Sequence, residues 1–144
     1  MRTNFDWQPE YGLATCTLTT KKGKIIEGNA LCHPDDSIVQ SEYVGCDLAE
    51  LRALGNYLVE VRDNELKPGL AALKQYYYSI NQSKRFNPDS YEARMLKRQI
   101  CRLEAEIKEY NARIDANKAI IKAFLARIEK SAQKLKEVKS RKSN

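Results

Sequence analysis

Residues 96–138 read LKRQICRLEAEIKEYNARIDANKAIIKAFLARIEKSAQKLKEV, and this stretch decides the fold of the chain. Isoleucine recurs at every seventh position and is followed by leucine: Ile100, Ile107, Ile114, Ile121, Ile128 and Leu135. A second apolar series, which includes Leu96, Leu103 and Phe124, lies three or four positions from the first. Heptad spacing of this length predicts one long helix packed lengthwise against another helix, as in a coiled coil.

The first third of the chain predicts a small β-sheet. Residues 13–20 and 24–32 are rich in β-branched and alternating apolar residues, and Lys22-Gly23 between them supplies a turn, so we expect a β-hairpin. Its inward face should hold Ala14, Cys16, Leu18, Ile26, Gly28, Ala30 and Cys32. Residues 1–12 show an irregular pattern, and residues 33–46 are expected to form a connecting loop.

Three helices are expected after the loop. Asp47, with Glu50 three positions later, resembles a capping box and predicts the first start. Pro68 predicts a kink or a new start near Lys67, and Asn87-Pro88-Asp89 predicts the start of the last helix, over 88–139. The fold class is therefore α+β: a small sheet unit at 1–46, then an antiparallel helical hairpin with a long coiled-coil helix at 47–144.

The apolar face of the last helix broadens near its middle. Five residues widen it, and we take them as the candidate surface for a partner or for self-association: Ile120, Ile121, Phe124, Leu125 and Ile128. The alternative is that the first helix and the sheet of the same chain cover this face. A simple parallel homodimer is disfavoured, because it would bring Arg113 near Lys118 and Lys134 near Lys139.

Positive charge is concentrated at the end of the chain. The formal net charge is +6, and residues 127–144 hold seven Lys or Arg against Glu129 and Glu137. Such a tail attracts nucleic acid, acidic protein or anionic surfaces, unless it is only a solvated helix end. A tyrosine-rich segment at 76–86 adds stacking surface beside cations. The candidate nucleic-acid contacts are Tyr76, Tyr78, Lys84, Arg85, Lys130, Lys134, Lys139, Arg141 and Lys142.

Evidence for catalysis or a cofactor is weak. His33 is the one histidine, and its neighbours Asp35 and Asp36 are more typical of a turn than of an acid–base site. Cys16, Cys32, His33 and Cys46 lack zinc-ligand spacing. We therefore predict no enzyme activity, no metal and no cofactor. No apolar leader or membrane-length segment occurs, which favours a cytosolic protein with reduced thiols.

Three segments resemble small accessory proteins encoded by bacteriophages and prophages: Cys32-His33-Pro34-Asp35-Asp36, Asn64-Glu65-Leu66-Lys67-Pro68, and Tyr76 to Pro88. The resemblance covers most of residues 13–110, and it assigns no functional residues. It implies a context, because such viral proteins often bind and inhibit a host defence complex or handle nucleic acid.

Two functions follow as expectations. The first is a non-enzymatic binding protein, phage-encoded and acting in the host cytosol, that docks on a host macromolecular complex in the manner of an anti-CRISPR inhibitor. The alternative is a nucleic-acid-binding accessory protein that uses the basic helix end and the tyrosine-rich segment. Homo-oligomerisation is compatible with both expectations, and no membrane partner is expected.

Overall fold

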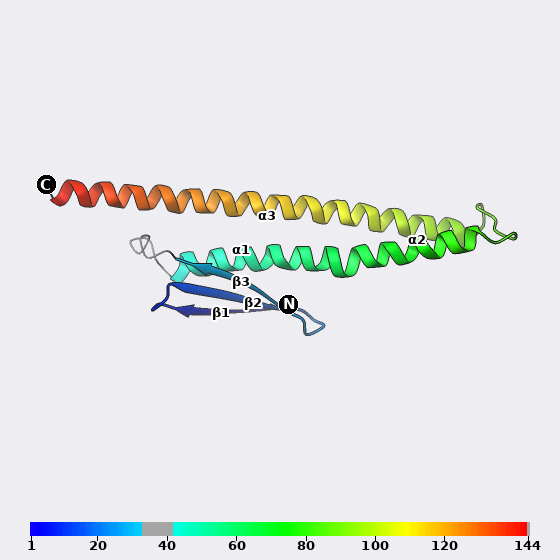
Figure 1. Cartoon of the computed structure of the whole chain (residues 1–144), viewed down its shortest axis with the longest axis horizontal. Helices are drawn as coiled ribbons and strands as arrows, with labels where there is room; N and C mark the ends of the chain where they lie inside the picture. The colour runs from blue at the N-terminus through cyan, green and yellow to red at the C-terminus, as the bar shows by residue number, and fades with distance from the viewer. Residues whose placement is uncertain (33–41, 144) are drawn as a thin grey trace. The chain divides into compact units, whose positions relative to one another are not determined.

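The structure, a computed structural model, describes residues 1–32 and 42–143 of the chain (Figure 1). Its architecture is α+β, because a three-stranded antiparallel sheet comes first and helices follow. The strands are β1 (Arg2–Gln8), β2 (Leu13–Thr19) and β3 (Ile25–Leu31), in the order β1-β2-β3. The helical elements are α1 (Glu42–Val61), the π-helical turn η2 (Arg62–Leu66), α2 (Lys67–Asn81) and α3 (Tyr91–Ser143). The predicted class, a small sheet followed by helices, is confirmed.

The chain forms two compact units. Unit 1 combines Met1–Tyr57 with Asp115–Asn144, and unit 2 is Leu58–Ile114. Unit 1 thus holds the sheet, most of α1 and the last part of α3, whereas unit 2 holds α2 and the first part of α3. The predicted division of the chain into consecutive segments, 1–46 and 47–144, stays a prediction.

The core of unit 1 lies between the sheet and α1. Six of the seven residues predicted for the inward face are in register within β2 and β3, with Cys16 opposite Gly28. The seventh, Cys32, lies just beyond β3 and is half-buried. The buried cluster combines residues of these two strands with one stripe of α1: Ala14, Cys16, Leu18, Ile26, Ala30, Leu48, Ala49 and Ala53. The apolar side chains at every second strand position face α1, and this contact buries them.

The prediction that residues 1–12 are irregular is wrong. Residues Arg2–Gln8 form β1, which pairs with β2 so that Phe5 lies opposite Cys16 and Trp7 opposite Ala14. Thr3, Phe5 and Trp7 therefore alternate onto the inward face. A third strand satisfies the need for more than a two-stranded hairpin, which alone is marginally stable.

Gly28 brings β3 and α1 into close contact. A Cβ atom at this position would overlap the backbone nitrogen of Ala53 and the backbone oxygen of Ala49. These are main-chain atoms of a helix and cannot rotate away. The small residues Gly28, Ala49 and Ala53 therefore set the separation of the sheet and the helix.

The first helix begins earlier than predicted. It starts at Glu42, so Asp47 and Glu50 lie inside α1 rather than at its cap. The local capping preference is overridden by packing, because Gly45 in the additional turns lies against Trp7 and Ala14. Of the predicted loop 33–46, residues 42–46 are helical, and residues 33–41 lie outside the described part.

The kink or new start predicted near Lys67 takes the form of a change in helix type, because α2 begins at Lys67 directly after the π-helical turn η2. The backbone N–H of Lys67 donates to Arg62 O, five residues earlier, which is the bond that defines a π-helical turn. Helical backbone therefore continues from α1 through η2 into α2, with Pro68 in the first turn of α2. A change in helix type accommodates the missing proline donor without ending the helix.

In unit 2, contacts join α2 to the first half of α3. Lys74 Nζ lies 3.4 Å from Glu104 Oε1, and Lys97 Nζ lies 5.8 Å from the centre of the Tyr77 ring. The last helix begins at Tyr91, three residues later than predicted, because the N-cap is Ser90: its Oγ accepts from Ala93 N–H at 3.2 Å.

Candidate functional site

The five residues predicted as a partner surface do not share one environment. Ile121 and Phe124 are half-buried and pack against the core cluster of unit 1. Ile128 is half-buried as well. Ile120, at 53% exposure, and Leu125 lie at the surface. The unit's own core thus takes up the middle of this broad face and leaves its two margins exposed.

The apolar seam of α3 contains the polar residue Asn117, whose contacts with α1 explain its position. Its side-chain Nδ2 donates to Leu51 O at 3.0 Å, and its Oδ1 occupies the space that a side chain at position 55 would fill. Gly55 therefore makes room for Asn117. Pairing a polar seam residue with a glycine fixes the register between α1 and α3 within unit 1.

Beyond Ala132, which is buried, the seam of α3 is exposed. Leu135 is 40% exposed and Val138 is 45% exposed, although both continue the two apolar series of the heptad. Their relative spacing keeps them on one side of the helix. The end of α3 therefore presents an apolar strip to solvent, which we call the terminal strip: Leu135 and Val138.

Basic side chains lie beside the terminal strip. All five tail residues predicted to contact nucleic acid are exposed: Lys130, Lys134, Lys139, Arg141 and Lys142. At about 100° per residue, Arg127, Lys130, Lys134 and Arg141 share one side of α3. This combination of an apolar strip and a basic side is typical of helices that dock on an acidic-rimmed apolar groove or on a polyanion.

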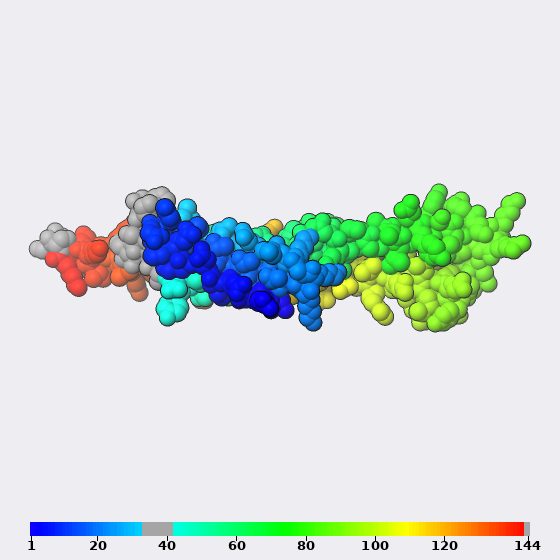
Figure 2. Space-filling view, turned by 90° about the horizontal axis from the view of Figure 1, so that it is seen from below, coloured from blue at the N-terminus to red at the C-terminus, as the bar shows by residue number. Residues whose placement is uncertain are grey.

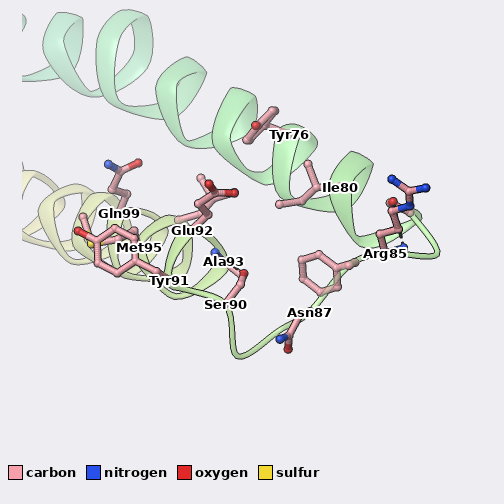
Figure 3. Close-up of a pocket in the computed structure, with 13 residues that line it drawn as sticks. Tyr76, Ile80, Arg85, Asn87, Ser90, Tyr91, Glu92, Ala93, Met95 and Gln99 are labelled. Carbon is pink, nitrogen blue, oxygen red and sulfur yellow. Dashed lines mark hydrogen bonds between the residues drawn. The ribbon is translucent and has the colours of Figure 1, made fainter.

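A second candidate site is an open hollow of about 590 Å³ in unit 2, where the loop after α2 meets the start of α3 (Figure 3). Tyr76 and Arg85, both predicted nucleic-acid contacts, are among its lining residues. Tyr78 and Lys84 are exposed but do not line it. Phe86 packs edge-on against Tyr77 with ring centres 5.9 Å apart, which orders the loop.

The predicted nucleic-acid contacts are thus divided between the units. The tyrosine-rich segment belongs to unit 2, and the basic end of α3 belongs to unit 1. Sequence reasoning missed the contribution of α3 to the hollow. Met95 and Gln99 line it because they lie one and two helical turns after Tyr91. That spacing was visible in the sequence once the helix start was fixed.

The residues considered for chemistry give no assembled site in the described part. His33, Asp35 and Asp36 lie outside the described residues. Burial raises the pKa of the Cys16 thiol, and burial also raises that of Cys46, so both favour the unreactive protonated form. No group of three or more metal-ligating side chains occurs within residues 1–32 and 42–143.

Comparisons with known proteins add no assignment. No family model matches the chain, and neither a curated protein nor a solved structure is significantly similar to it. The bacteriophage resemblance therefore stays a prediction. Among the described helices, none is both long and apolar enough to cross a membrane.

Proposed function

We propose that this chain is a non-enzymatic binding protein that docks on another macromolecule through the end of α3. The proposal is based on the exposure of the terminal strip, Leu135 and Val138. The strip continues the seam of α3, in which the earlier residues Ile121 and Phe124 pack against a core. An apolar strip that continues a packing seam into solvent is suited to a groove on a partner.

The chemistry of the partner follows from the neighbouring charges. Lys130, Lys134 and Arg141 flank the strip, so an apolar groove with an acidic rim on a protein is the best complement. The expectation that this partner is a host defence complex, and that docking inhibits it, is part of the proposal. It rests on the bacteriophage resemblance alone. The reduced host cytosol is the compartment that fits this role.

A matched pair of variants tests the proposal by affinity capture. Leu135→Asp with Val138→Asp removes the strip, and Ile25→Asp removes an aliphatic side chain on the sheet that is even more exposed. We expect a defined protein to be captured by the wild type and by Ile25→Asp, and to be lost with the double variant. Equal capture by all three proteins contradicts docking through α3.

Nucleic-acid binding is a second candidate, favoured by the alignment of Arg127, Lys130, Lys134 and Arg141 on one exposed side of α3. It predicts affinity that falls steeply with salt, with a slope of log K against log salt of about −0.9 per duplex phosphate contacted. Reversing Lys130, Lys134 and Arg141 to Glu should weaken binding about equally for all sequences. Gel shifts that show no complex at about 50 mM salt eliminate this candidate.

We also propose that α2 and the first half of α3 pair as an antiparallel coiled-coil hairpin within unit 2. Supporting contacts are the Lys74–Glu104 ion pair and the hydrogen bond at 2.9 Å from Arg62 Nη1 to Asn111 Oδ1. Gly69 adds to this support, because a Cβ there would lie 3.9 Å from Leu103 Cδ1, an ordinary packing distance. Crosslinking of Lys74→Cys to Glu104→Cys by a short bismaleimide would report this pairing, and the absence of a crosslink would contradict it.

A further inference from the structure

The two edges of the sheet differ in whether their outward-pointing backbone groups have hydrogen-bond partners. At the β3 edge, Arg52 Nη1 donates to Asn29 O and Asn56 Nδ2 donates to Glu27 O, both at 2.8 Å. These two carbonyls point away from β2, and an added strand would have to use them. Polar side chains from α1 occupy them instead, which blocks this edge against further pairing.

At the β1 edge, no side chain of the described residues occupies the outward-pointing backbone groups. The hydrogen-bond pattern identifies which groups point outward. In an antiparallel ladder, the N–H and C=O of one residue point to the same neighbour, and successive residues alternate. Thr20 N–H donates to Lys24 O at 2.9 Å, and Cys32 N–H donates to Gly12 O at 2.9 Å. Even-numbered residues of the β2 segment therefore bond to the β3 side, and odd-numbered ones bond to β1.

The partners of those odd-numbered β2 residues are Arg2, Asn4, Asp6 and Gln8. The intervening residues of β1 must direct their N–H and C=O groups outward: Thr3, Phe5 and Trp7. Within residues 1–32 and 42–143, these outward groups have no hydrogen-bond partner. Figure 2 shows β1, in dark blue, at the surface with no other segment over it in that view.

The inward face of β1 is also only partly covered. Gly45 of α1 contacts Trp7, but by Ala49 and Ala53 the helix lies over Gly28 of β3. The helix thus crosses away from β1 and leaves its first half open. Phe5, although it points to the inward face, is 49% exposed, and Met1 is 55% exposed.

We propose that β1 pairs antiparallel with β1 of a second copy of this chain. In the register centred on Asn4, the outward-pointing backbone groups of Thr3 meet those of Phe5 of the second copy. The same register places Arg2 directly opposite Asp6 of the second copy, twice by symmetry. Both side chains are exposed, and neither has an ion pair among the described residues.

The charges favour this register over the next register that also brings outward-pointing backbone groups together, which is centred on Phe5. Centring on Phe5 would place Arg2 opposite Gln8 and Asn4 opposite Asp6, so neither charge would face an opposite charge. Opposite charges at directly facing strand positions stabilise an antiparallel pair, and like charges destabilise it. Charge complementarity therefore identifies the occupant of this edge as the same strand of another copy.

The product is a continuous six-stranded sheet with a twofold axis perpendicular to it. Both α1 helices lie on the same face of that sheet, because the axis preserves the face. The two Phe5 side chains become diagonal neighbours across the axis, on the face that α1 leaves open. Pairing thus covers the apolar surface and the open backbone groups together.

Charge-swapped variants test the proposal by sedimentation at about 50 mM salt, where exposed charges are least screened. We expect the wild type to form a concentration-dependent dimer. Arg2→Asp and Asp6→Arg should each dimerise about tenfold more weakly alone, because two attractive pairs become repulsive. Mixed together, the two variants should form a heterodimer of wild-type affinity, since every facing pair is again complementary.

A backbone variant provides an independent test. Thr3→Pro removes an N–H that points away from β2, so it should leave the fold intact by circular dichroism and abolish the dimer. Asn4→Ala, which keeps every backbone donor, is the control and should dimerise like the wild type. A monomer at all concentrations overturns the proposal. A dimer that is unaffected by every β1 variant overturns it equally, because the interface then lies elsewhere.

Discussion

The contact between Gly28 and α1 gives the sharpest stability prediction. Alanine at position 28 would put Cβ inside the backbone of Ala49 and Ala53, so α1 must move away from β3. A gap on the order of 1 Å forfeits a quarter to a half of the dispersion energy across this interface. The same movement stretches the hydrogen bonds that Arg52 and Asn56 donate to β3.

The expected cost is about 3 kcal/mol, at the upper end for overpacking, because the clashing atoms belong to a helix backbone. Reduced freedom of the unfolded chain offsets up to about 1 kcal/mol of this cost. The net loss of about 2 kcal/mol should lower Tm by about 7 °C in a chain of this size. Thermal unfolding followed by circular dichroism at the helix band measures the change.

Gly69→Ala is the matched control. The same substitution there meets only Leu103 Cδ1 at 3.9 Å and lies within a helix. It should stabilise the protein by about 0.5–1 kcal/mol, since alanine is the better helix former. If Gly28→Ala unfolds at or above the wild-type temperature, the close approach of sheet and helix is refuted.

Three further predictions concern single side chains. Asn117→Ala should lower the unfolding free energy by about 1 kcal/mol in urea titrations, because the hydrogen bond to Leu51 O is lost; an unchanged midpoint would argue against its role in register. The hydrogen bond from Arg62 holds the pKa of Asp63 below its usual 3.8, so the stability from this carboxylate is present above pH 3.8 and is lost as pH falls through the lower folded pKa. The Tm difference between wild type and Asp63→Asn should therefore shrink on acidification at low salt, and a constant difference would contradict the pairing. In maleimide labelling followed by mass spectrometry, the exposed Cys101 should react long before the buried Cys16, and the reverse order would contradict the core assignment.

The sequence was sufficient to predict those elements in which a regular spacing of apolar residues determines the structure. Alternation in β2 and β3 predicted both the strands and their inward residues, and the isoleucine heptad predicted α3. Strand β1 was missed although polar Arg2, Asn4, Asp6 and Gln8 alternate with Thr3, Phe5 and Trp7, because Asn and Asp have low β-propensity. It forms because β2 offers a ladder edge, which is a tertiary effect.

The starts of α1 and α3 were predicted less well, since packing and local capping decide them. Contact of Gly45 with Trp7 extends α1 beyond the cap expected at Asp47, and a π-helical turn carries the helix past Pro68. The candidate surface was likewise divided by tertiary contacts. Ile121 and Phe124 pack against the core, which the sequence left open, and the exposure of Leu135 and Val138 depends on where that packing ends.

Site-specific photo-crosslinking in the producing cell tests docking through α3 most directly. A photoreactive phenylalanine analogue would replace Leu135 or Val138 in turn, with the same analogue at the more exposed Ile25 as the control. We predict one discrete protein adduct from positions 135 and 138 and none from position 25. The absence of adducts from α3, or an equal yield of the same adduct from position 25, would contradict the account.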